Sequence, residues 1–135
     1  MLRKVRVVVP NDAGEITVVV ADDTSDIREL IKLTLDLEGG FDVVAEAEDG
    51  VEAVQMVENH RPDVILLDLS MPLMDGFEAI PVIKERCPQT KILVFSGLDE
   101  SSMRSEALET GADGFVPKGT DSDLLVASVR ALLQG

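Results

Sequence analysis

The chain alternates between short, continuously apolar runs and longer segments in which apolar residues recur every three or four positions. The short runs suit strands buried on both faces, and the longer spacing suits helices with one apolar side. The runs predict five strands, at Ile16–Ala21, Asp42–Ala47, Asp63–Leu69, Lys91–Ser96 and Gly114–Val116. The segments between and after them predict five helices, around residues 27–35, Val51–Asn59, Phe77–Arg86, Glu100–Thr110 and Asp121–Gln134.

Regular alternation of strands and helices is typical of an α/β domain with a parallel sheet covered on both faces. Residues 16–135 are predicted to form this one domain, since no linker or repeat interrupts the pattern. Residues 1–15 form an extension that the pattern does not include, and we expect it to be flexible because chain termini commonly fray. Pro81 lies inside the third predicted helix, where we expect a local distortion.

Composition narrows the classes of function. The 135 residues include 26 acidic and 12 basic side chains, for a net charge of −14. This balance argues against direct binding of nucleic acid or an anionic membrane by the chain itself. One cysteine and one histidine exclude an internal disulfide framework and a His-pair metal site. Without a signal-peptide core or a membrane-spanning run, we expect a cytoplasmic protein.

Polar residues follow four of the predicted strands. Asp22 and Asp23 follow the first strand, Asp68 lies at the end of the third, Ser96 ends the fourth and Lys118 follows the fifth. Taken singly, such an aspartate is usually a turn or cap residue, and such a lysine is usually solvated. In a parallel sheet, however, the carboxyl ends of the strands share one edge, where ligands bind.

Three carboxylates held close together repel one another, and a hard divalent cation such as Mg²⁺ relieves that repulsion. A carboxylate in such a place can attack phosphorus and form an aspartyl-phosphate, while a lysine and a metal neutralise the phosphoryl charge. The strand-end residues therefore predict an acidic site that can be phosphorylated.

From Ile16 to Gln134 the chain resembles the receiver domain of bacterial two-component response regulators. The segments that carry the resemblance are VVVADDTSDIREL, ILLDLSMPLMDGFEA, ILVFSG and ETGADGFVPKG. The resemblance implies a flavodoxin-like (βα)5 doubly wound sheet with strand order 2-1-3-4-5. It also implies a signalling switch that a sensor histidine kinase, a phosphotransfer protein or a small phospho-donor phosphorylates, in many cases with homodimerisation on phosphorylation.

The resemblance assigns roles to individual residues. Asp68 matches the phosphoacceptor, and Lys118 matches the lysine that pairs with the phosphoryl group. The implied Mg²⁺ ligands are the side chains of Asp22, Asp23 and Asp68 and the backbone carbonyl of Ser70. Ser96 and Phe115 match the switch residues, and Ser70 and Leu98 the positions that tune the lifetime of the phosphoryl group. For Leu98, an ordinary loop role is equally open.

One departure from the family concerns the residue after Lys118. Many receivers have a cis-proline there, whereas this chain has Gly119, so the cis bond is not carried over. Two other functions stay open. One is a Mg²⁺-dependent phosphatase with an aspartyl nucleophile, although Ser70 stands where such enzymes usually have a second aspartate. The other is a receiver used only for binding. We expect either a stand-alone receiver or the receiver of a longer regulator, not an enzyme with turnover.

Overall fold

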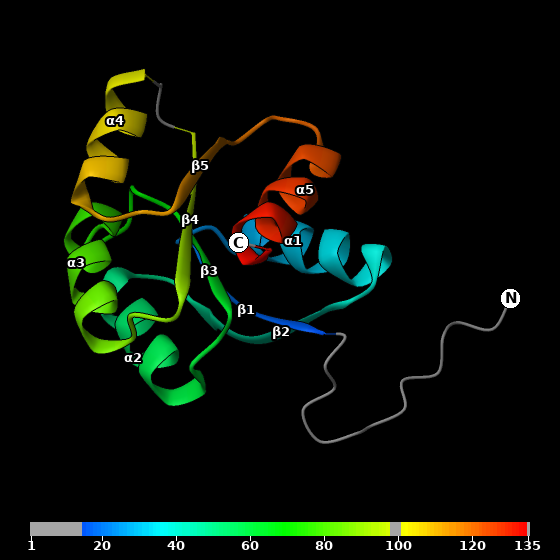
Figure 1. The fold of residues 1–135 in the computed structure, drawn as a ribbon, viewed down its shortest axis with the longest axis horizontal. Helices are drawn as coiled ribbons and strands as arrows, with labels where there is room; N and C mark the ends of the chain where they lie inside the picture. The colour runs from blue at the N-terminus through cyan, green and yellow to red at the C-terminus, as the bar shows by residue number, and fades with distance from the viewer. Residues whose placement is uncertain (1–14, 98–100, 135) are drawn as a thin grey trace, which may run out of the picture.

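The computed structural model describes residues 15–97 and 101–134, which form a parallel sheet with helices on both faces (Figure 1). The strands are β1 (Ile16–Ala21), β2 (Phe41–Ala47), β3 (Val64–Leu67), β4 (Lys91–Ser96) and β5 (Gly114–Pro117). The helices are α1 (Ser25–Glu38), α2 (Gly50–His60), α3 (Gly76–Arg86), α4 (Ser101–Thr110) and α5 (Ser122–Leu133). The predicted elements are all present, and no end differs by more than three residues from its predicted position.

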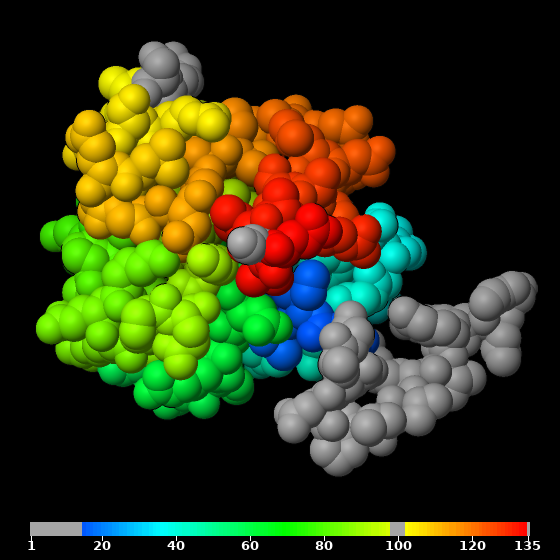
Figure 2. Space-filling view, in the orientation of Figure 1, coloured from blue at the N-terminus to red at the C-terminus, as the bar shows by residue number. Residues whose placement is uncertain are grey.

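The strand order is β2-β1-β3-β4-β5, and all four pairings are parallel. The flavodoxin-like α/β fold is thus confirmed. Helices α2, α3 and α4 cover one face of the sheet, and α1 and α5 cover the other (Figure 1). In the space-filling view α3 and α4 lie side by side along one flank of the molecule (Figure 2).

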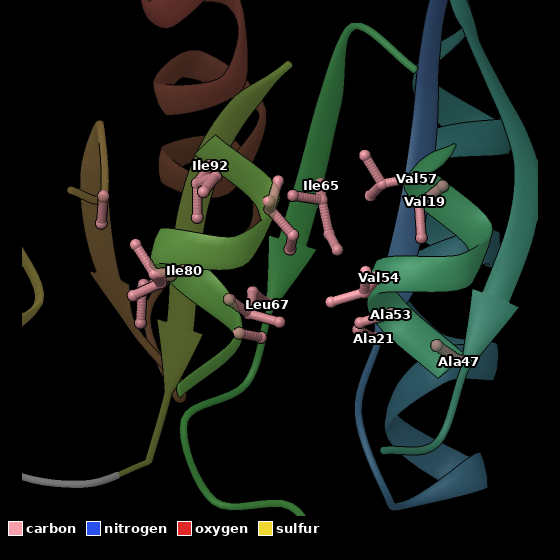
Figure 3. Packing of buried hydrophobic residues seen from close by; sticks show 14 of the residues in the cluster. Val19, Ala21, Ala47, Ala53, Val54, Val57, Ile65, Leu67, Ile80 and Ile92 are labelled. Atoms are coloured by element: carbon pink, nitrogen blue, oxygen red, sulfur yellow. The ribbon is translucent and has the colours of Figure 1, made fainter. Parts of the chain in front are cut away.

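Neighbouring residues of each strand point into different hydrophobic cores, as the two-residue period of a strand requires. Val19, Ile65 and Ile92 pack with residues of α2 and α3, including Val54 and Ile80 (Figure 3). Their neighbours on the strands pack instead with α1 and α5; they include Val18, Val20, Val64, Leu66 and Leu93. This double burial explains why the strands are apolar at consecutive positions.

The expectation for Pro81 is modified by the packing. Helix α3 runs through Pro81 without interruption, and Pro81 is exposed, so its ring lies in solvent and not against the sheet. In α1, Ile31 and Leu35 are buried, whereas Leu30 is 59% exposed. Among the described helices, none has both the length and the apolar character that a bilayer crossing requires.

Two glycines allow backbone segments to approach each other beneath the carboxyl edge of the sheet. A Cβ at Gly50, the first residue of α2, would collide with the carbonyl oxygen of Met74. The Gly50 amide donates a 2.8 Å hydrogen bond to that same oxygen. A Cβ at Gly76 would collide with the carbonyl oxygen of Asp68. The loop between β3 and α3 is therefore held by backbone contacts that only glycine permits.

We expect Gly50→Ala to lower the free energy of unfolding by about 1–3 kcal/mol, because the methyl group overpacks against the Met74 backbone. This is the net change, after the gain of up to about 1 kcal/mol that alanine usually brings to a helix. Urea denaturation followed by circular dichroism measures the change. Gly97→Ala is the control, since its Cβ would come no closer than 3.8 Å to Lys118. Equal stability of wild type and Gly50→Ala would contradict the close-approach argument.

Candidate functional site

The backbone hydrogen bonds of the sheet continue just past the strands and hold the site residues at one edge. The Asp68 amide donates to the carbonyl oxygen of Ala21 at 3.0 Å, and the Asp22 amide donates to that of Ala47 at 2.9 Å. The Lys118 amide donates to the Ser96 carbonyl oxygen at 2.8 Å. The polar residues of β1, β3, β4 and β5 are thus brought to the same edge, as the strand order requires.

Three carboxylates lie together at this edge. One oxygen from each of Asp22, Asp23 and Asp68 lies within 4.8 Å of the others, and we call these residues the acidic cluster. Asp22 and Asp68 are buried, with exposed fractions of 1% and 4%, whereas Asp23 is exposed. The cluster is therefore open to solvent on the side of Asp23 and enclosed by protein around the other two carboxylates.

The ammonium group of Lys118 bridges the two buried members of the cluster. Its Nζ lies 2.6 Å from Asp22 Oδ2 and 3.5 Å from Asp68 Oδ2. The lysine therefore offsets part of the negative charge, and it lies within reach of any group carried by the Asp68 carboxylate. Pairing with Lys118 also explains how two carboxylates can be buried side by side.

The pKa of Asp68 is raised above its ordinary value of 3.8. Burial is the main cause, because it penalises the charged carboxylate, and the negative charges of Asp22 and Asp23 add to it. Lys118 and the Ser70 amide, which donates to Asp68 Oδ1 at 3.4 Å, act in the opposite direction. The surroundings of Asp68 therefore disfavour its ionised form.

The remaining predicted site residues lie around the cluster. Ser96 is fully buried at the end of β4, and Phe115 is buried in β5, where it pairs with Val94 of β4. Ser70 is exposed two residues after Asp68. Leu98 and residues 1–14 of the predicted extension lie outside the described residues. The bond between Lys118 and Gly119, whose geometry the sequence left open, is trans, since no cis peptide bond occurs in the described parts of the chain.

Two contacts at the acidic cluster were not predicted from the sequence. The Thr24 amide donates to Asp22 Oδ1 at 2.9 Å. Aspartate side chains often accept a hydrogen bond from the amide two residues later, in an Asx turn, so an aspartate directly after a strand could have suggested this contact. The Arg28 guanidinium donates to the backbone carbonyl of Asp22 at 2.6 Å. A single arginine within a helix carries no signal of such a role, because the contact depends on how α1 packs against the sheet.

Comparison with known proteins places this arrangement in a family. The response regulator receiver domain family matches residues 18–130. DegU, a transcriptional regulatory protein of Brevibacillus brevis, is 42% identical over 122 residues, which cover 90% of this chain and 52% of DegU. The chemotaxis protein CheY of Bacillus subtilis is 35% identical over 116 residues, or 86% of this chain and 96% of CheY.

Comparison with solved structures also finds receiver domains. The signal receiver domain of NarL from Mycobacterium tuberculosis superposes with a TM-score of 0.85 at 36% identity, covering 90% of this chain and 98% of that domain. The chain spans about half the length of DegU, so the match concerns the receiver part of that regulator. Sequence and fold agree: the chain belongs to the response regulator receiver domains of two-component systems.

Proposed function

We propose that this receiver is a phosphorylation-dependent switch in which Asp68 accepts a phosphoryl group. The observation that carries the proposal is the burial of Asp68 against two further carboxylates and the Lys118 ammonium. The ionised form of Asp68 is disfavoured and the Lys118 cation lies nearby, so a reaction that changes the charge of Asp68 would change the electrostatics of the cluster.

The acidic cluster fits a magnesium ion. Mg²⁺ is bound by one or two protein carboxylates together with water and phosphate oxygens, and the three carboxylate oxygens within 4.8 Å offer such a set. Asp22, Asp23 and Asp68 would hold the ion with their side chains, and Ser70 with its backbone carbonyl. When bound, the ion would neutralise charge on the phosphoryl oxygens and relieve the repulsion within the cluster.

In the proposed reaction, an Asp68 carboxylate oxygen forms a bond to phosphorus. The bond from phosphorus to the donor's nitrogen or oxygen breaks, and its electron pair leaves with the donor. Lys118 is placed to pair with the phosphoryl oxygens, because its Nζ lies 3.5 Å from Asp68 Oδ2. The Ser96 hydroxyl would then donate a hydrogen bond to a phosphoryl oxygen. The donor is a sensor histidine kinase, a phosphotransfer protein or a small phospho-donor.

The switch would reach the surface through β4, β5 and α4. Ser96 and Phe115 lie on these neighbouring strands, and Phe115 belongs to the same hydrophobic core as Ala107 of α4. A hydrogen bond that draws Ser96 toward Asp68 would alter the packing of Phe115 and of α4. The altered face would then engage an output partner, or a second copy of the chain, in the cytoplasm. We propose no turnover of an external substrate and no nucleic acid binding by this chain.

Phosphorylation of Asp68 is tested by intact mass spectrometry of the full chain with acetyl phosphate and MgCl₂. We expect the wild type to gain about 80 Da, the mass of one phosphoryl group, and Asp68→Asn to gain nothing. Asp75→Asn is a matched control because asparagine also caps helices, as Asp75 does at the start of α3. This variant should be phosphorylated like the wild type.

Three results would count against the proposal. An unmodified wild type would favour a receiver that only binds partners. Equal modification in excess EDTA would remove the role of magnesium. Continuous release of phosphate from a phosphomonoester would support the phosphatase, although Ser70 lacks the carboxyl group that usually serves as acid and base in such enzymes.

Removal of the Asp68 charge should stabilise the metal-free protein. Because the folded-state pKa of Asp68 is raised, its ionisation destabilises the fold as pH rises from about 4 through that pKa, and not below. We expect Asp68→Asn to raise Tm at pH 7 in EDTA by about 3–5 °C, corresponding to about 1 kcal/mol. The difference should shrink toward zero near pH 3.5. Calorimetry across pH measures it, and an unchanged or lower Tm at pH 7 would refute the repulsion argument.

A further inference from the structure

Arg28 of α1 forms a bridge between a neighbouring strand and the chain segment that carries the acidic cluster. Its Nη1 donates a 2.6 Å hydrogen bond to the backbone carbonyl oxygen of Asp22. Its Nε donates to Glu46 Oε1 of β2 at 2.9 Å. The Arg28 side chain is 17% exposed and the Glu46 side chain 35%, so the pair is partly buried.

The Glu46 end of this bridge is itself fixed. Its second oxygen, Oε2, accepts from Lys32 Nζ at 2.7 Å, one turn further along α1. The Lys32 hydrogen bond and the Arg28 hydrogen bond both hold the pKa of Glu46 below its ordinary value of 4.5. Glu46 therefore stays ionised at neutral pH and presents a fixed acceptor, which constrains the plane and direction of the Arg28 guanidinium.

The position of the Asp22 carbonyl oxygen influences the orientation of Asp23. This carbonyl belongs to the peptide unit that joins Asp22 to Asp23, and the unit is planar, so fixing its oxygen fixes the direction in which the chain enters Asp23. Asp22 is already held on its other sides, since its amide bonds to Ala47 and its Oδ1 accepts from the Thr24 amide. The Arg28 contact therefore restrains the remaining rotation of this peptide.

We propose that Arg28 is a positioning residue that sets the orientation of Asp23 toward Asp68 and thereby raises the affinity of the acidic cluster for a divalent cation. The inference rests on the proposed function, because it concerns the same cluster. Arg28 would act through the backbone of Asp22, with Glu46 as its anchor, and would not contact the ion.

An electrostatic role and a positioning role for Arg28 predict opposite changes in Mg²⁺ affinity when Arg28 is replaced. A guanidinium near a cation site repels the cation, so a purely electrostatic role predicts tighter Mg²⁺ binding when the positive charge is removed. A positioning role predicts weaker binding, because Asp23 loses its fixed orientation. Arg28→Lys separates the two further, since it keeps the charge but cannot reproduce the planar fork that reaches both partners.

The experiment is an Mg²⁺ titration of the 135-residue chain, followed by backbone amide shifts in NMR spectra. Wild type, Arg28→Lys and Arg28→Gln are compared with the matched variants Arg86→Lys and Arg86→Gln. Arg86 pairs with Glu58 at 3.0 Å and so also joins a helix to a neighbouring element by an arginine–glutamate contact, away from the cluster. Amide spectra recorded without Mg²⁺ establish that each variant is folded.

We expect the Kd for Mg²⁺ to rise about tenfold in both Arg28 variants, as is typical when an outer partner of a metal ligand is removed. The Arg86 variants should keep the wild-type Kd. An unchanged or lower Kd in folded Arg28→Lys and Arg28→Gln would overturn the positioning role while leaving the proposed function intact. Absence of Mg²⁺ binding by the wild type would instead refute the proposed function, and the positioning role with it.

Discussion

The acidic cluster depends on one constraint: the sheet places like charges side by side and does not let them move apart. Asp22 and Asp68 follow adjacent parallel strands, and the Asp68 amide is bonded to the carbonyl that precedes Asp22. The strands are buried on both faces, so the backbone cannot yield to the repulsion between the carboxylates. Lys118, held next to Ser96 by the same ladder, supplies the opposing charge.

Close backbone contacts hold the segments next to the acidic cluster in place. Gly50 and Gly76 let the start of α2 and the start of α3 contact backbone atoms of the β3–α3 segment directly. The capping box at Asp75 and Glu78 then fixes where α3 begins. The loop after Asp68 is thereby tied to two helices. In the proposed switch, a change at Asp68 would therefore spread to α4 through β4 and β5.

The Arg28 bridge connects β2 to the chain segment that carries the acidic cluster. This strand lies at the edge of the sheet and contributes no member of the acidic cluster, yet Glu46 anchors the arginine that contacts the Asp22 carbonyl. An ion pair joining α1 to β2 thus also restrains the end of β1. Its contribution to stability alone would be small, as is usual for partly exposed pairs, so its value to the protein would lie in geometry.

The sequence by itself determined the elements, their order and the strand-end residues that meet at the acidic cluster. Those features rest on local patterns: consecutive apolar residues for doubly buried strands, helical spacing between them, and polar residues such as Asp68 and Lys118 directly after strands. Tertiary structure alone decided that Leu30 is exposed, that Gly50 meets Met74 and that Arg28 reaches Asp22. These outcomes depend on the distance and rotation between packed elements. Local periodicity determines which face of a helix is apolar. It does not determine which atoms of a neighbouring strand or loop contact the rest of the helix surface.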